Sequence, residues 1–80
     1  MNISFYEIDG GTAWTVTEDY MVIGTAYDES GGWEFYPTPD GTRFGYEFAV
    51  GTTRAKAIIN SREEGKRKAA RAEKRRSRMQ

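Results

Sequence analysis

The sequence predicts an α+β fold in which a small antiparallel sheet of three to five strands precedes one C-terminal helix, which extends into a basic tail. Three observations support this prediction. All eleven aromatic residues fall between Phe5 and Phe48, among β-branched residues and turn signals. After residue 50 the apolar spacing changes from that of a strand to that of a helix. The charge of the chain also changes sign there, from a net −8 over residues 1–50 to a net +8 over residues 51–80.

The expected strands follow one another through the first fifty residues, with turn sequences between them. We expect strands at 3–8, 12–17, 21–27, 33–37 and 43–50. The turn DGG at 9–11 suits a tight hairpin because glycine readily adopts a positive φ. In PDG at 39–41, proline restricts φ and the aspartate can bond its own backbone, so we expect a second reversal there.

The hairpin expected between 33–37 and 43–50 has the clearest alternation in the chain. Trp33 and Phe35 point to one face, and Phe44, Tyr46 and Phe48 share a face of the second strand. The open face is expected to carry Glu34, Tyr36, Arg43 and Glu47. We expect the core to contain Trp14, Trp33, Phe35, Phe44 and Phe48.

The helix is expected to begin after Thr52 or Thr53, either of which can serve as the N-cap. Ala55, Ile58 and Ile59 have the spacing of an apolar stripe that packs on the sheet, and we expect the helix to leave the core near Ser61. The prediction divides the chain into a sheet-plus-helix domain at 1–64 and a basic helical extension or tail at 65–80. Beyond Gly65 we expect a nascent or frayed helix, because stacked arginines repel one another and glycine is a poor helix former.

Composition argues against several functional classes. The chain has no cysteine and no histidine, so the thiol nucleophile, the usual general base and a thiolate zinc site are all missing. We therefore expect no enzymatic activity, no metal site and no cofactor. The longest apolar stretches are too short to cross a membrane, and the N-terminus lacks the basic region of a signal peptide, so we expect a cytoplasmic protein.

The basic tail is the first candidate site. Its residues are Lys66, Arg67, Lys68, Arg71, Lys74, Arg75, Arg76 and Arg78. These cations could neutralise phosphates of DNA or RNA over two to four helical turns, or bind another acidic partner. The alternative is a solvated helix end that balances the acidic half, either within the chain or across a homodimer.

The acidic, aromatic half is the second candidate site. We expect Glu34, Tyr36, Glu47, Asp28 and Glu29 to contact a partner with a basic surface. A protein that handles nucleic acid has such a surface in its binding groove. The alternative is that Glu and Tyr occupy the hydrated face of an ordinary half-buried sheet.

Residues 33–64 contain FYPTPDG and GTTRAKAIINS, and this segment resembles the strand–turn–strand–helix part of HicB-type antitoxins. The resemblance covers less than half of the chain and implies a non-enzymatic module that blocks a partner. In size, aromatic hairpins and charge distribution the chain is also similar to small phage-encoded proteins, including anti-CRISPR-type inhibitors.

Together these features predict a non-catalytic binding or inhibitory protein, encoded by a phage, whose acidic sheet docks on a basic host protein. Two alternatives remain open. One is a nucleic-acid-binding protein that uses the basic C-terminal helix. The other is a structural homo-oligomer in which basic tails bind acidic sheets.

Overall fold

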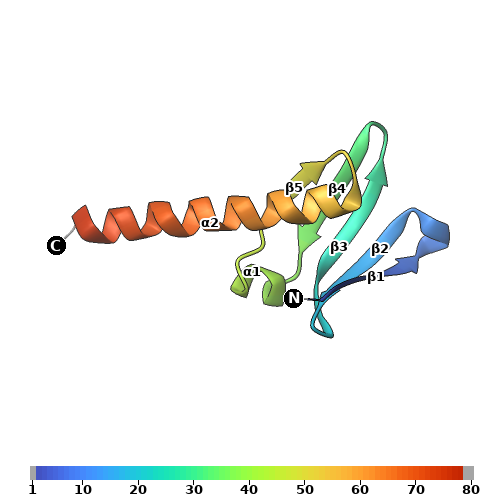
Figure 1. Ribbon diagram of the computed structural model, residues 1–80, viewed down its shortest axis with the longest axis horizontal. Coiled ribbons are helices and arrows are strands. Elements are labelled where there is room, and N and C mark those ends of the chain that lie inside the picture. The colour runs from blue at the N-terminus through green and yellow to red at the C-terminus, as the bar shows by residue number, and fades with distance from the viewer. Residues whose placement is uncertain (1, 79–80) are drawn as a thin grey trace.

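Four strands form where the sequence alternates, and each predicted turn between them reverses the chain. The structure is a computed structural model that describes residues 2–78, and it contains a five-stranded antiparallel sheet and one long helix (Figure 1). The first four strands are β1 (Ile3–Ile8), β2 (Ala13–Glu18), β3 (Met21–Glu29) and β4 (Gly32–Pro37). The turn η1 (Asp9–Gly11) joins β1 to β2, with Gly10 at a φ of 67°. The predicted α+β class is therefore confirmed.

The sheet is a simple meander in which neighbours in sequence are neighbours in space. Its strand order is β1-β2-β3-β4-β5, where β5 is Ala49–Gly51. β1 is an edge strand that pairs with β2 of the same chain. Because paired residues of antiparallel strands point to the same face, the register divides the strand side chains into two sets.

One face of the sheet is covered by α2 (Arg54–Arg78), and the core lies between them. The buried cluster consists of Val16, Ile23, Ala26, Phe35, Tyr46, Ala57 and Ile58. At the start of α2, the guanidinium of Arg54 lies 4.4 Å from the ring centroids of both Phe5 and Trp14. This cation–π contact offsets the unfavourable position of a cation at a helix N-terminus.

The predicted strand at 43–50 is wrong over most of its length. Residues Pro39–Arg43 form the short helix α1, and β5 begins only at Ala49. The reason is local: the Gly41 amide donates to Thr38 Oγ1 at 3.1 Å, which makes Thr38 an N-cap with proline directly after it. Gly45 then has a φ of 94°, so the chain turns again before it can pair with β4.

This turn changes which aromatic side chains are buried. Phe44 and Phe48 were expected in the core, but their exposed fractions are 57% and 48%. Tyr46, between them, is completely buried. The core prediction is confirmed for Phe35, while Trp14 and Trp33 are partly buried.

The helix α2 begins as predicted but buries a different side. Thr53 Oγ1 accepts the amide of Lys56 at 3.1 Å, which confirms Thr53 as the N-cap. The buried positions are Ala57, Ile58, Ser61 and Gly65, whereas Ala55 and Ile59 are exposed. The predicted stripe is therefore correct only at Ile58. The helix also stays in contact with the globule one turn beyond Ser61.

Gly65 does not mark the end of order. It is buried in the middle of α2, and a Cβ atom placed there would overlap the carbonyl oxygen of Gly45. The glycine therefore lets the helix lie directly against the loop before β5. Beyond this contact α2 remains helical to Arg78, where a nascent or frayed helix was expected.

This contact predicts that Gly65→Ala destabilises the protein, although alanine at an exposed helical site stabilises by about 1 kcal/mol relative to glycine. We expect a loss of about 1–3 kcal/mol in the free energy of unfolding, because the new methyl group has no space. Urea denaturation followed by circular dichroism measures it. The control Ala69→Gly, at an exposed site one turn later, should lose only about 1 kcal/mol. A stabilised Gly65→Ala variant would contradict the close packing.

Candidate functional site

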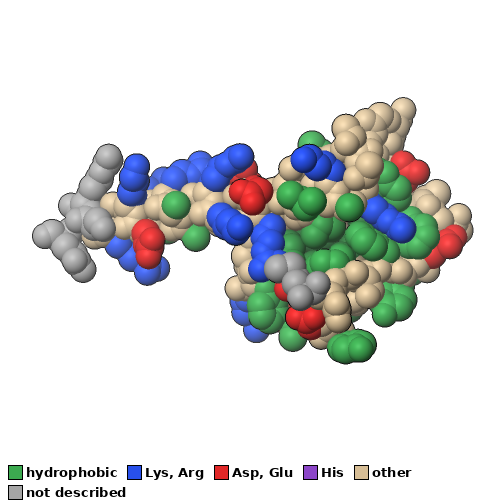
Figure 2. All heavy atoms as spheres, viewed as in Figure 1, with side chains coloured by type: hydrophobic (Ala, Val, Ile, Leu, Met, Phe, Trp, Pro, Cys, Tyr) green, Lys and Arg blue, Asp and Glu red, His purple; other side chains and the backbone are tan. Residues whose placement is uncertain are grey.

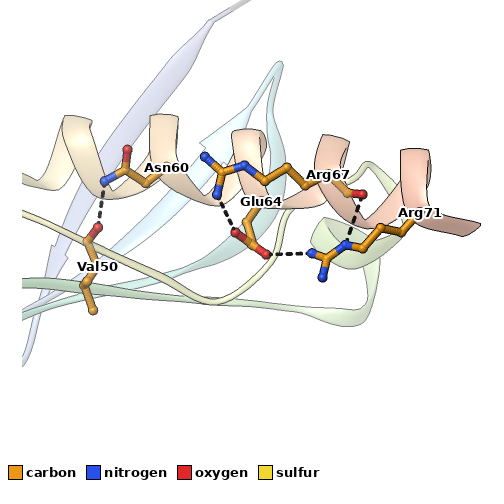
Figure 3. A network of polar contacts seen from close by, with 5 residues as sticks. All are labelled: Val50, Asn60, Glu64, Arg67 and Arg71. Carbon is orange, nitrogen blue, oxygen red and sulfur yellow. Dashed lines mark hydrogen bonds and ion pairs between the residues drawn. The ribbon is translucent and has the colours of Figure 1, made fainter.

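The direction of α2 is set by polar contacts with the segment that leads into β5. Ser61 and Glu47 exchange two hydrogen bonds: Glu47 N donates to Ser61 Oγ at 2.9 Å, and Ser61 Oγ donates to Glu47 O. The preceding residue also contributes, since Asn60 Nδ2 donates to the carbonyl oxygen of Val50 at 2.8 Å (Figure 3). These contacts satisfy backbone groups at the edge of the sheet and fix the helix over it.

The C-terminal part of α2 projects from the globule, as Figure 1 shows. We call residues 66–78 the C-terminal rod. Every residue from Lys66 to Arg76 is exposed, and the molecule measures 52 × 28 × 19 Å. Its radius of gyration of 13.9 Å exceeds the value of about 12 Å typical of a compact chain of this length. The rod carries eight Lys or Arg and one Glu, and Figure 2 shows basic side chains along both of its edges.

The structure gives the cations of the rod two different environments. Near the globule, Lys66 pairs with Glu63 at 3.6 Å and Lys68 with Glu47 at 3.2 Å. Arg67 and Arg71 share the carboxylate of Glu64, at 3.1 and 3.2 Å (Figure 3).

Farther out, the side chains of Lys74, Arg75 and Arg76 form no ion pair or hydrogen bond with any residue of the range 2–78. The side chain of Arg78, also in the predicted set, lies outside the described part of the structure. The positive charge of the rod is therefore least compensated at its far end.

The rod has two chemically different sides. Arg67, Arg71, Lys74 and Arg75 follow helical spacing, and they form what we call the basic stripe. The other side is a shallow groove lined by Lys66, Ala69, Ala70, Ala72, Glu73 and Arg76, which we call the alanine side.

The face of the sheet that α2 does not cover is the second candidate site. Three of the five predicted residues, Glu29, Glu34 and Tyr36, lie together there with Tyr27, and these four line a shallow depression of about 290 Å³. The rings of Tyr27 and Tyr36 meet edge to face, with centroids 5.5 Å apart. Tyr36 Oη donates to Glu34 Oε1 at 3.2 Å. Burial, and then the adjacent Glu34, raise the pKa of Tyr36 above its usual value.

The other residues predicted for this face are elsewhere. Asp28 pairs across the sheet with Trp33, so it points to the face that α2 covers. Glu47 turns toward the rod and pairs with Lys68. Arg43 is on α1, where it pairs with Asp40 at 3.1 Å. Glu47 and Arg43 were misplaced because the expected strand at 43–50 is replaced by α1 and a loop. Asp28 lies beyond the expected strand at 21–27, whereas β3 continues to Glu29, so the strand register decides its face.

Sequence reasoning missed most of the exposed apolar residues of the open face. They are Tyr6, Ile8, Tyr27, Phe48 and Val50. The alternation of side chains along a strand could have identified Tyr27. Residues two apart share a face, and Tyr27 lies two residues before Glu29, with Asp28 between them. Phe48 could not be found in this way, since it lies outside the strands and contacts Tyr36 with ring centroids 5.0 Å apart.

A buried polar cluster joins the sheet to α2 behind these surfaces. Tyr46 Oη donates to Glu18 Oε1 at 2.6 Å, and Arg62 lies 3.7 Å from the same carboxylate. Burial, followed by the hydrogen bond to Glu18 and its charge, raises the pKa of Tyr46 to about 12, with Arg62 opposing the shift. Among the described residues, the cluster contains one of the two ion pairs between the acidic first half and the basic second half, and it stabilises the fold.

Within residues 2–78 the structure contains no group of three or more potential metal-ligating side chains. None of its helices has the length and apolarity needed to span a membrane. Comparisons with protein-family models, with curated proteins and with solved structures found no match.

The raised pKa of Tyr46 predicts a loss of stability at high pH. Because the folded pKa lies above the ordinary value of 10.0, the stabilisation is complete below pH 10 and is lost as the pH rises through about 12. The loss should amount to about 2–3 kcal/mol in the free energy of unfolding. Denaturation at several pH values, with Tyr46→Phe as reference, measures this loss. The stability difference between the two proteins should fall over this range, and a constant difference would contradict the assignment.

Proposed function

We propose that the C-terminal rod binds nucleic acid through its phosphate backbone. The observation that carries this proposal is the outward position of Lys74, Arg75 and Arg76, which have no partner within the described residues. Cations that are already paired must break an ion pair before they contact phosphate, whereas these three need only release water. A helix held outside the globule can also approach a duplex without a clash between the duplex and the sheet.

The shape of the rod favours a duplex with an accessible groove. An α-helix with its side chains is about 10–12 Å wide, and the major groove of B-form DNA is about 12 Å wide. The basic stripe places arginine and lysine on one side of the helix, where they can reach phosphates on the walls of the groove. Such contacts are largely independent of base sequence. We therefore propose nonspecific, salt-dependent binding, with duplex DNA as the ligand to test first.

Neutralising Lys74→Gln and Arg75→Gln together should weaken binding to duplex DNA and lower its salt dependence. Each lost phosphate contact lowers the slope of log K against log salt by about 0.9, so the double variant should lower it by about 2. Glutamine forms helices about as well as lysine and arginine, so the rod should remain helical. Fluorescence anisotropy with a labelled duplex over a range of salt concentrations measures both quantities.

The matched control is Arg43→Gln with Lys56→Gln, which changes the net charge equally but alters exposed cations outside the rod. We expect its salt slope to stay close to that of the unaltered protein. Equal losses in the two double variants would show a general charge effect and contradict a binding role for the rod. The absence of binding to duplex at low salt would also contradict it.

A second function is favoured by the open face of the sheet, which would dock on a basic protein surface. The specific observation is the depression in which Tyr27 and Tyr36 are combined with two carboxylates, Glu29 and Glu34. Aromatic rings and carboxylates are the groups that bind arginine and lysine side chains. In this proposal the protein is an inhibitory module of phage origin that covers a basic site on a host protein.

Reversing the charge of Glu29 should weaken the binding of a basic ligand to the open face. The probe is a labelled oligo-arginine peptide, and its anisotropy in the presence of Glu29→Lys should show at least about a tenfold loss of affinity. Asp28→Lys is the matched control, because Asp28 is exposed but points to the opposite face of the same strand. Similar losses in both variants would assign the binding to overall charge and contradict a site on the open face.

A further inference from the structure

The five described strands bring exposed apolar side chains and carboxylates to the open face, but no cation. Its register places Ile8, Ala13, Tyr27, Glu34 and Val50 in one row across all five strands. A second row contains Tyr6, Thr15, Thr25 and Tyr36. None of the five strands contains a lysine or arginine. This face therefore offers apolar contact together with uncompensated negative charge.

The depression at Tyr27 and Tyr36 has the chemistry of a guanidinium site. The two rings stand 80° apart, so the face of one ring can be presented to a cation that lies in the depression. Glu34 accepts one hydrogen bond from Tyr36, and its second oxygen can accept a bond from an arginine. On the covered face of the same sheet, Arg54 already lies over two aromatic rings in this manner.

The rod of the same chain cannot reach this depression. α2 packs on the opposite face, where Ala57 and Ile58 belong to the core with Phe35. From Arg54 to Arg78 the helix is continuous, so it does not bend back around the edge of the sheet. A rod can therefore contact an open face only when the two belong to different molecules.

The rod fits the open face in length and in surface. Its thirteen residues span about 20 Å as a helix, and five strands span about 19 Å from the first to the last. Ala69, Ala70 and Ala72 allow the helix axis to approach a flat apolar surface closely. On the same side Arg76 has no ion pair with residues 2–78, so its guanidinium is available.

We propose that the protein associates with itself by laying the alanine side of one rod across the open face of a second copy. Arg76 then enters the depression formed by Tyr27, Glu29, Glu34 and Tyr36. The proposal rests on the second function above, in which the open face is a docking surface. It identifies the partner that binds this surface as a second copy of this chain.

This arrangement leaves the basic stripe exposed. Arg67, Lys74 and Arg75 are on the other side of the helix, so they face away from the sheet on which the rod is laid. Apart from Arg76, self-association and nucleic-acid binding therefore use different sides of the same helix. An assembled protein would present several basic stripes to one duplex, which raises the apparent affinity without any new type of contact.

Sedimentation velocity of the full chain at low salt, over a range of protein concentrations, tests the proposal. We expect the weight-average mass to rise above the 9.1 kDa of one chain as the concentration increases. Glu34→Lys and Arg76→Glu should each weaken association by about tenfold or more, because a repulsion replaces an attraction. When Glu34→Lys and Arg76→Glu chains are mixed, the first can offer its rod and the second its open face, so mixed assemblies should form.

Two matched variants separate this contact from a general effect of charge. Asp28→Lys alters the covered face of the sheet and Arg75→Glu alters the basic stripe, and we expect both to associate like the unaltered protein. Association weakened equally in these controls would overturn the proposal, as would a constant mass of one chain. If that monomer still bound oligo-arginine at the open face, the face would be assigned to another basic protein, and the second proposed function would survive without self-association.

Discussion

The contact between Gly65 of α2 and Gly45 is the constraint on which the rest of the architecture depends. Neither residue has a side chain, so the helix lies directly on the loop, and the adjacent Ser61–Glu47 hydrogen bonds hold it there. With α2 fixed over the sheet, its direction beyond Gly65 is also fixed. The cations that follow are therefore carried outward on a straight helix and do not fold back on the acidic strands.

The sequence was sufficient for the hairpins of the first 37 residues but not for the segment that supports α2. Between Ile3 and Pro37 the alternation and the turn residues agree with each other, so local signals determine the strands. At 43–50 the same alternation of aromatic residues was misleading. The N-cap at Thr38 begins a helix, and the positive φ of Gly45 reverses the chain. Tyr46 is then the aromatic residue that is buried under α2. Its burial depends on contacts between distant parts of the chain, which cannot be predicted from the periodicity of the sequence.

The two candidate sites also differ in how far local sequence signals can predict them. The basic set could be predicted because its members are consecutive on one helix, and helical spacing alone brings them together. The acidic set required the register of two strands, β3 and β4, and the position of a loop. Glu29, Glu34 and Tyr36 lie together because β3 pairs with β4. Glu47 is not part of this group because it forms an ion pair with Lys68, a contact that no sequence pattern shows. Tyr27, which lines the same depression, could have been found by alternation along β3.

A net charge of zero says little about how this molecule interacts with others. Only two ion pairs, Arg62–Glu18 and Lys68–Glu47, join the basic half to the acidic half among the described residues, and neither involves the far end of the rod. At physiological salt, charges separated by more than about 8 Å are largely screened from each other, and the rod is more than twice that long. The positive potential at its far end is therefore almost independent of the carboxylates on the sheet, and the negative potential of the open face is almost independent of the rod. The protein behaves as two oppositely charged surfaces on one rigid support, so a partner at either surface meets that local charge and not the sum over the chain.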